Sequence, residues 1–246
     1  MIKIRASFKT PDALHLVTRC VSEGQTFKAF RKNPSLTHRV TTSFEMRSSR
    51  TMLLGLLPIG LLLLVISPAT AGQRTKVVIT SSLDGAAQPC SVVLPAEFDT
   101  AQRAPLLVSL HSWSADLEQR KPLLEKLAGQ RGWICLFPNF RGANDDPLAC
   151  GSLAAQQDIL DAVTWAKKHY EIDLRRVYLT GVSGGGHMTM LMAGCHPEVW
   201  TAASAWVGIS DLASWYAKHE HDRYGAMMRK VCGGAPGESA AVDRQY

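Results

Sequence analysis

The chain has 246 residues, of which 46% are hydrophobic and 20% charged, and this composition is ordinary for a globular protein with a sizeable core. Its net charge of +6 is concentrated in residues 1–71, which carry ten Lys and Arg against three Asp and Glu. Residues 72–246 carry 17 basic and 18 acidic side chains and no basic patch interleaved with aromatics. Nucleic acid is therefore excluded as a leading partner.

Residues 46–71 show the order of regions that is typical of a secretory signal peptide. Arg47 and Arg50 precede an apolar run of 14 residues, Leu53 to Ile66, and a small-x-small pattern follows that ends at Ala71. This run is shorter than the roughly 20 residues that span a bilayer, so we expect cleavage after Ala71, with an uncleaved membrane anchor as the alternative. Both alternatives predict an exported protein, secreted or periplasmic, that contacts a membrane only through this segment.

Residues 1–45 form a leader in front of the predicted signal peptide. They are polar and basic and show no sustained periodicity. We interpret them as the product of a mis-assigned gene start, with translation beginning at Met46 or Met52. Residues 72–246 remain as a single folded domain.

Short apolar runs alternate with helical patterns along this domain. The first two runs flank the turn signal LDGAAQP and predict a hairpin. A continuous apolar run is typical of a strand that is buried on both faces. The predicted strands are 76–80, 90–95, 105–113, 133–138, 175–183 and 201–212 with its terminal loop, and the predicted helices are 116–130, 152–170 and 184–195.

This alternation predicts an α/β fold, a mostly parallel sheet with helices on both faces. Binding and catalytic sites in such sheets form at the carboxyl ends of the strands. Three polar clusters fall at those ends, at 111–113, 139–142 and 181–185. We therefore expect the functional site where these clusters meet.

The third cluster has the pattern Gly-x-Ser-x-Gly between a buried strand and an apolar helix. This arrangement predicts a nucleophile elbow, a sharp turn that exposes the hydroxyl of Ser183. Gly181 and Gly185 leave the space that such a tight turn needs. A glycine-rich structural turn is the alternative interpretation.

Acyl transfer also needs hydrogen-bond donors for the oxyanion, usually two backbone N–H groups. Gly184, directly after the nucleophile, is expected to supply one. For the other we choose Trp113, with Ser112 as the next candidate, although Trp113 suits a core aromatic equally well. His111, before this loop, is interpreted as a structural histidine.

Three segments, 137–145, 154–212 and 224–246, resemble the catalytic domain of the prolyl oligopeptidase family. This family is a branch of the α/β-hydrolase superfamily that also extends to acyl esterases. The resemblance implies a serine hydrolase acting on peptide or ester bonds, with Ser183 as the nucleophile. Two features depart from the family pattern: no segment resembles the N-terminal propeller of its peptidases, and His111-Ser112 stands where relatives often have His-Gly.

The acid and the histidine of a catalytic triad follow the serine in this fold. Only one clear strand follows Ser183, and the family pattern would need two more, so we expect a domain truncated at its C-terminus and inactive as given. The alternative is a triad within the chain, with Asp211 as the acid and His219 or His221, preferably His221, as the base. His187 is interpreted as structural.

The sequence thus predicts an exported serine hydrolase that forms an acyl-enzyme on Ser183 and acts on a peptide or a small acyl ester. Peptidase activity ranks narrowly before esterase activity, and an inactive relative that retains the fold for binding is the rival class. No metal and no organic cofactor is expected, since two histidines near Asp222 are weak evidence for a metal site.

Overall fold

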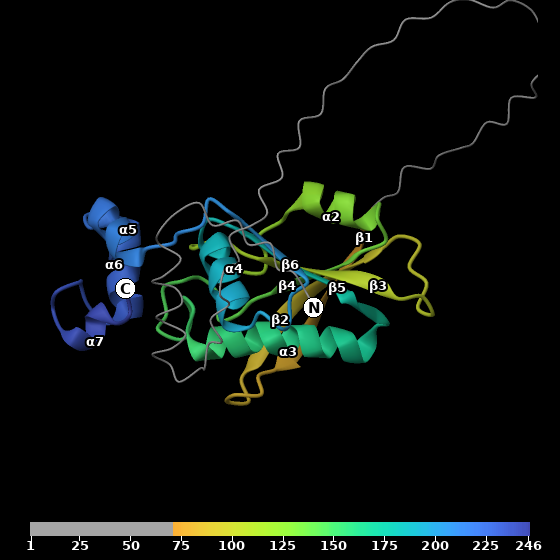
Figure 1. The fold of residues 1–246 in the computed structure, drawn as a ribbon, viewed down its shortest axis with the longest axis horizontal. Coiled ribbons are helices and arrows are strands. Elements are labelled where there is room, and N and C mark those ends of the chain that lie inside the picture. Colours follow the sequence, from red (N-terminus) through yellow and green to blue (C-terminus); the bar gives the residue numbers. More distant parts are fainter. Residues whose placement is uncertain (1–70) are drawn as a thin grey trace, which may run out of the picture. The chain divides into compact units, whose positions relative to one another are not determined.

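The computed structural model describes residues 71–246 (Figure 1). The predicted leader and the predicted signal peptide, apart from Ala71, lie outside the described residues. The strands are β1 Ala71–Thr80, β2 Ala87–Pro95, β3 Ala104–Leu110, β4 Ile134–Pro138, β5 Ile172–Val182 and β6 Ala202–Trp206. The helices are α2 Pro122–Gly129, α3 Leu153–His169, α4 Gly184–Cys195, α5 Leu212–His219, α6 Arg223–Cys232 and α7 Ala240–Asp243.

The six strands form one mixed sheet in the order β1-β2-β4-β3-β5-β6. β1 and β2 are an antiparallel hairpin, as predicted, and β2 pairs antiparallel with β4. The remaining neighbours, β4 with β3, β3 with β5 and β5 with β6, are parallel. The predicted α/β class is confirmed, and the parallel part of the sheet includes β5, the strand that ends directly before Ser183.

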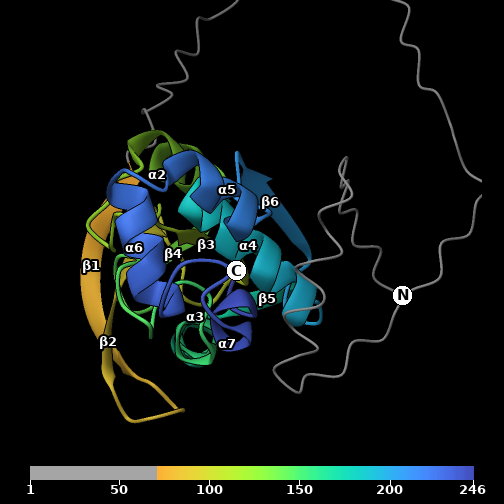
Figure 2. The same cartoon turned by 90° about the vertical axis from the view of Figure 1, so that its left-hand side faces the viewer.

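The continuous apolar strands lie at the centre of the sheet because helices cover both of its faces (Figures 1 and 2). Every residue of β3 and β4 is buried. On one face Leu106 and Leu136 pack with α3 and α4 through Ile159 and Leu191. On the other face the neighbouring side chains pack with α2, and these are Leu107, Cys135 and Ala128.

Hydrogen-bonding side chains begin several of the helices. The Ser152 hydroxyl accepts from the N–H of Ala155 at the start of α3. Asp211 and Asp222 cap α5 and α6 in the same manner. None of the helices between residues 71 and 246 is long and apolar enough to cross a membrane.

Two strands end earlier than predicted. β3 stops at Leu110, where its pairing with Gly181 of β5 ends, so residues 111–113 belong to the loop that follows. β6 stops at Trp206, because Val207 takes a positive φ of 42° and directs the chain out of the sheet. The early end of β3 places Ser112 beside the residue before Ser183, since the Ser112 hydroxyl donates to the carbonyl of Val182 at 3.2 Å.

Candidate active site

Ser183 lies between the end of β5 and the start of α4, in a strained turn. Its backbone has φ 58° and ψ −119°, a conformation that a residue with a side chain rarely adopts. The Ser183 N–H donates to the carbonyl of Trp206 at 2.9 Å, and its own carbonyl accepts from the N–H of His187 at 2.9 Å. The turn is thereby tied to β6 and α4, and its half-buried serine has the geometry of a nucleophile elbow.

Two glycines of the turn lie against the backbone that follows β3. A methyl group on Gly184 would overlap the backbone nitrogen and Cα of Trp113. A methyl group on Gly185 would overlap the carbonyls of Leu110 and His111. The absence of side chains at these positions brings the first turn of α4 into direct contact with the loop 111–113.

This contact brings two backbone N–H groups together beside the serine. The Gly184 N–H is at the start of α4, where no carbonyl of the helix can accept from it and the helix dipole favours negative charge. Within residues 71–246, the Trp113 N–H also donates to no protein group. Ser112 differs, since its N–H donates to Gln119 Oε1 at 3.0 Å. Of the two donors considered for this loop, Trp113 has the available N–H.

The side chain of Trp113 belongs to the core as well. Its indole is 1% exposed and lies edge-on to Trp215, with ring centroids 4.8 Å apart, and near His187 at 6.2 Å. The two interpretations of Trp113 are therefore compatible, because burial of the indole fixes the backbone whose N–H faces the turn.

His111 holds the loops after β3 and β4 together. Its ring is 4% exposed and stacks on Phe140, with centroids 3.9 Å apart and planes 8° from parallel. One ring nitrogen is 3.0 Å from the carbonyl of Ser112 and the other is 2.9 Å from that of Asn139. Burial lowers the pKa of His111. The structural role predicted for this histidine agrees with these contacts.

A half-buried lysine binds the end of the strand that leads into this loop. Lys121 Nζ donates to the carbonyl of Leu110 at 2.7 Å and to the hydroxyl of Ser109 at 2.9 Å. Burial lowers the pKa of Lys121 to about 8. The last residues of β3 are thus anchored before the chain turns toward Trp113.

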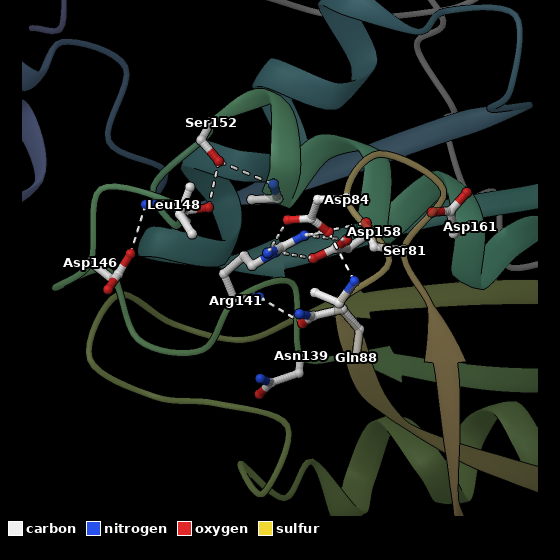
Figure 3. Close-up of polar contacts among 12 residues, drawn as sticks. Ser81, Asp84, Gln88, Asn139, Arg141, Asp146, Leu148, Ser152, Asp158 and Asp161 are labelled. Carbon is white, nitrogen blue, oxygen red and sulfur yellow. Dashed lines mark hydrogen bonds and ion pairs between the residues drawn. The ribbon is translucent and has the colours of Figure 1, made fainter.

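The second polar cluster is built around Arg141 (Figure 3). Its guanidinium, 8% exposed, binds Asp158 of α3 at 2.6 Å and Asp84 of the β1–β2 turn at 2.9 Å. These hydrogen bonds raise the pKa of Arg141 and lower the pKa of Asp84 to about 2. We name Arg141, Asp84 and Asp158 the arginine clamp. It fixes the loop after β4, where Phe140 and Arg141 both have positive φ, and it is structural rather than catalytic.

The contacts of Asp211 and His221, the acid and base candidates, do not assign them to a catalytic triad. Asp211 accepts from the N–H and the hydroxyl of Ser214 at 2.9 and 2.7 Å, as the cap of α5. The side chain of His221 is 93% exposed and 4.0 Å from Glu220. Among residues 71–246 no hydrogen bond joins the Ser183 hydroxyl to a histidine. The assignment of Asp211 and His221 to a triad therefore stays a prediction.

The remaining histidines near these helices make local contacts. His187 Nδ1 is 2.8 Å from the carbonyl of Ile209, which fits its predicted structural role. His219 Nδ1 is 2.7 Å from Asp222 Oδ2 at the cap of α6. In the part of the chain that the structure describes, no three His, Cys, Asp or Glu side chains gather as a metal site would require.

The turn around Ser183 lies in a segment that matches a known protein family. Residues 123–236 match the sequence profile of the prolyl oligopeptidase family. The resemblance to this family is confirmed. The match includes β4, β5, α4 and β6, and so the whole turn around Ser183.

Solved structures of this family share the fold. An acylaminoacyl peptidase from Pyrococcus horikoshii superposes with a TM-score of 0.58 at 20% identity, over 72% of this chain and 29% of that chain. Prolyl oligopeptidase B from Galerina marginata superposes with a TM-score of 0.56 at 18% identity, over 71% and 25%. These likenesses establish an α/β-hydrolase fold.

Curated relatives with higher sequence identity are named as esterases. Feruloyl esterase B of Neurospora crassa is 32% identical over 124 residues, 45% of this chain and 41% of that protein. An acetylxylan esterase of Coprinopsis cinerea is 30% identical over 117 residues, 43% of this chain and 31% of that protein. The chain thus matches less than half the length of these relatives.

Proposed function

We propose that this protein is a serine hydrolase in which Ser183 attacks an acyl carbonyl. The observation that carries the proposal is the contact between Gly184 and the Trp113 backbone, which brings two available N–H groups together beside a strained, half-buried serine. Donors fixed in advance at this position stabilise the oxyanion that develops in the transition state.

The reaction would proceed through an acyl-enzyme. Ser183 Oγ forms a bond to the carbonyl carbon as its proton passes to a base, and the negative charge on the carbonyl oxygen is held by the Gly184 and Trp113 N–H groups. The tetrahedral intermediate then expels the protonated leaving group, and water releases the acyl group. Asp211 and His221 are the acid and base candidates that the sequence offers, but Asp211 caps α5 and His221 is exposed, so the proposal does not rest on them.

We favour an ester over a peptide as the substrate. The relatives that are 30 to 32% identical to this chain over 117 to 124 aligned residues are named feruloyl and acetylxylan esterases. The peptidase structures are 18 to 20% identical and support the fold alone. The proposed substrate class is an aromatic or acetyl ester of a sugar, and peptidase activity is the second candidate because of the family match.

Two assays test the proposal and separate the candidates. A fluorophosphonate probe should label Ser183, and a Ser183→Ala variant should not be labelled. Hydrolysis of methyl ferulate and 4-nitrophenyl acetate should exceed cleavage of acylated peptide anilides. Equal labelling of both proteins would contradict Ser183 as the nucleophile, and no labelling of the unmodified protein would contradict the hydrolase proposal for this chain and favour either a relative that only binds or the inactive domain that the sequence predicts.

We also propose that the protein is exported, on the strength of the signal-peptide pattern at residues 46–71. The mature protein would then begin at Gly72, directly after the predicted cleavage site. N-terminal sequencing of the native protein tests this, and a tryptic peptide from residues 1–45 in that protein would contradict both the cleavage and the gene-start interpretation.

A further inference from the structure

Ser112 makes an unusually complete set of hydrogen bonds for a half-buried loop residue. Its N–H donates to Gln119 Oε1 at 3.0 Å, and its hydroxyl accepts from Gln119 Nε2 at 3.1 Å. The same hydroxyl donates to the carbonyl of Val182 at 3.2 Å. One glutamine therefore binds both the backbone and the side chain of Ser112, and Ser112 in turn binds the end of β5.

These hydrogen bonds matter because of where Ser112 and Val182 lie in the chain. Val182 directly precedes the nucleophile, Ser183, and Ser112 directly precedes the oxyanion donor, Trp113. The hydrogen bond from Ser112 to Val182 therefore joins the two parts of the site across 70 residues of sequence. It fixes the distance between the attacking oxygen and the donor that must stabilise the product of its attack.

We propose that Ser112 and Gln119 are positioning residues for the hydrolase reaction, forming a hydrogen-bonded latch that holds the Trp113 N–H beside Ser183. Gln119 also occupies the Ser112 N–H, so that the oxyanion loop presents a single donor to the substrate. This inference rests on the proposed function, because it assigns a role within the same site.

Other hydrogen bonds already fix the rest of the loop. Its remaining movement relative to Ser183 therefore depends on the latch. The carbonyl of Ser112 lies 3.0 Å from His111 Nδ1 and accepts from the N–H of Ala115 at 3.1 Å. Lys121 holds the carbonyl of Leu110 at the end of β3. These contacts fix the loop internally and hold it to the end of β3, whereas the hydroxyl of Ser112 binds the loop directly to the carbonyl of Val182, the residue before Ser183.

The latch also accounts for the departure from the His-Gly pattern of the family. A glycine after His111 would have no side chain to reach Val182 or to accept from Gln119. The serine at this position adds both hydrogen bonds: its hydroxyl donates to the carbonyl of Val182 and accepts from the amide of Gln119, seven residues later. The pair is thus a local solution that this chain uses to place its oxyanion loop.

Two truncations test the latch by ester hydrolysis. Gln119→Ala should lower kcat about 10- to 100-fold and change KM less than about threefold, since displaced donors act on the transition state rather than on bound substrate. Ser112→Ala should lower kcat about tenfold, because the Gln119 contact to its N–H remains. Ser112→Thr keeps the hydroxyl and should restore kcat to within about threefold of the unmodified protein.

Glu118→Ala is the matched control. Glu118 is adjacent in the same loop, but its exposed side chain forms an ion pair with Lys76 and does not contact Ser112. Its kcat should stay at the level of the unmodified protein. Wild-type kcat in both truncated variants, or an equal loss in the Glu118 control, would overturn the latch.

A second measurement does not depend on turnover. Amide hydrogen exchange should speed up at Ser112 in the Gln119→Ala variant, because its N–H loses its acceptor, and stay slow in the Glu118→Ala control. If the unmodified protein is neither labelled by a fluorophosphonate nor active on esters, the proposed function fails and the exchange experiment still decides the latch. Unchanged exchange at Ser112 in Gln119→Ala would reject it.

Discussion

The turn around Ser183 and the helices α5 and α6 both carry residues that the sequence marks as catalytic candidates, yet they are built differently. At the turn, backbone groups converge: Gly184 contacts the backbone of Trp113, and two N–H groups lack acceptors within residues 71–246. At α5 and α6 the candidates make local contacts: Asp211 caps α5, and His221, in the turn between the two helices, is exposed. The candidate reactive site is therefore the turn, where backbone N–H groups are held in place without an acceptor within residues 71–246.

Removal of the Ser183 hydroxyl should have the largest effect on activity and is the strongest test of this comparison. Ser183→Ala should lower kcat about 10⁶-fold, to the rate that the oxyanion hole and binding alone provide. Ester hydrolysis under saturating substrate measures this, with circular dichroism as the check on folding. Substantial residual turnover would place the chemistry outside the turn and would remove the contrast between the two regions.

A methyl group in the turn tests the oxyanion geometry. Gly184→Ala should lower kcat about 10²- to 10³-fold, because the added methyl overlaps the Trp113 backbone and displaces its N–H. Gly194→Ala, in the same helix, is the control, since a methyl there meets no atom within 4 Å. Equal rates for the two variants would show that Trp113 is not a donor.

Breaking the arginine clamp should destabilise the protein rather than slow the reaction directly. Arg141→Met leaves the buried Asp158 carboxylate unpaired, which should cost about 3 to 5 kcal/mol of unfolding free energy. Arg175→Met is the control: the Arg175 side chain is 91% exposed, and its ion pair should contribute about 0 to 1 kcal/mol. Urea denaturation measures both, and similar losses would contradict the clamp.

The clamp also predicts a pH dependence. The folded-state pKa of Asp84 is lowered to about 2, so its pairing with Arg141 stabilises the protein above its usual pKa of 3.8 and is lost as the pH falls toward 2. Unfolding free energy of the unmodified protein should fall through this window, and Arg141→Met should flatten that part of the curve. An identical acid profile in both proteins would contradict this prediction.

The smallest effect is expected in α5 and α6. His221→Ala should change kcat less than about threefold, as for most exposed substitutions. Asp211→Ala should cost about 1 kcal/mol of stability by removing the cap of α5. If either variant loses activity to the level of Ser183→Ala, Asp211 and His221 belong to the catalytic triad after all.

Features determined by neighbouring residues could be read from the sequence. The apolar runs of β3 and β4 marked central strands, and the glycines around Ser183 marked the turn, because each depends on local space and burial. The end of β3 was placed three residues too late, since His111 to Trp113 leave the sheet only where the ladder with β5 stops.

Features determined by tertiary contacts could not be predicted. Gln119 looks like any polar loop residue, and only the folded loop brings its amide to Ser112. Arg141 and Phe140 take positive φ without being glycine, which opposes their local preference and is maintained by the clamp and by stacking on His111. No sequence pattern predicts that tertiary contacts will offset the backbone strain at these two residues.

The strained backbone at Ser183 means that the proposed nucleophile also lowers the stability of the protein. A φ of 58° costs any residue with a side chain about 1 to 3 kcal/mol, and glycine escapes most of that cost. Ser183→Gly should therefore be inactive yet melt at a higher temperature than Ser183→Ala. Selection for thermal stability alone would favour replacement of Ser183 by glycine. Retention of the serine in related proteins would therefore indicate selection for catalytic activity.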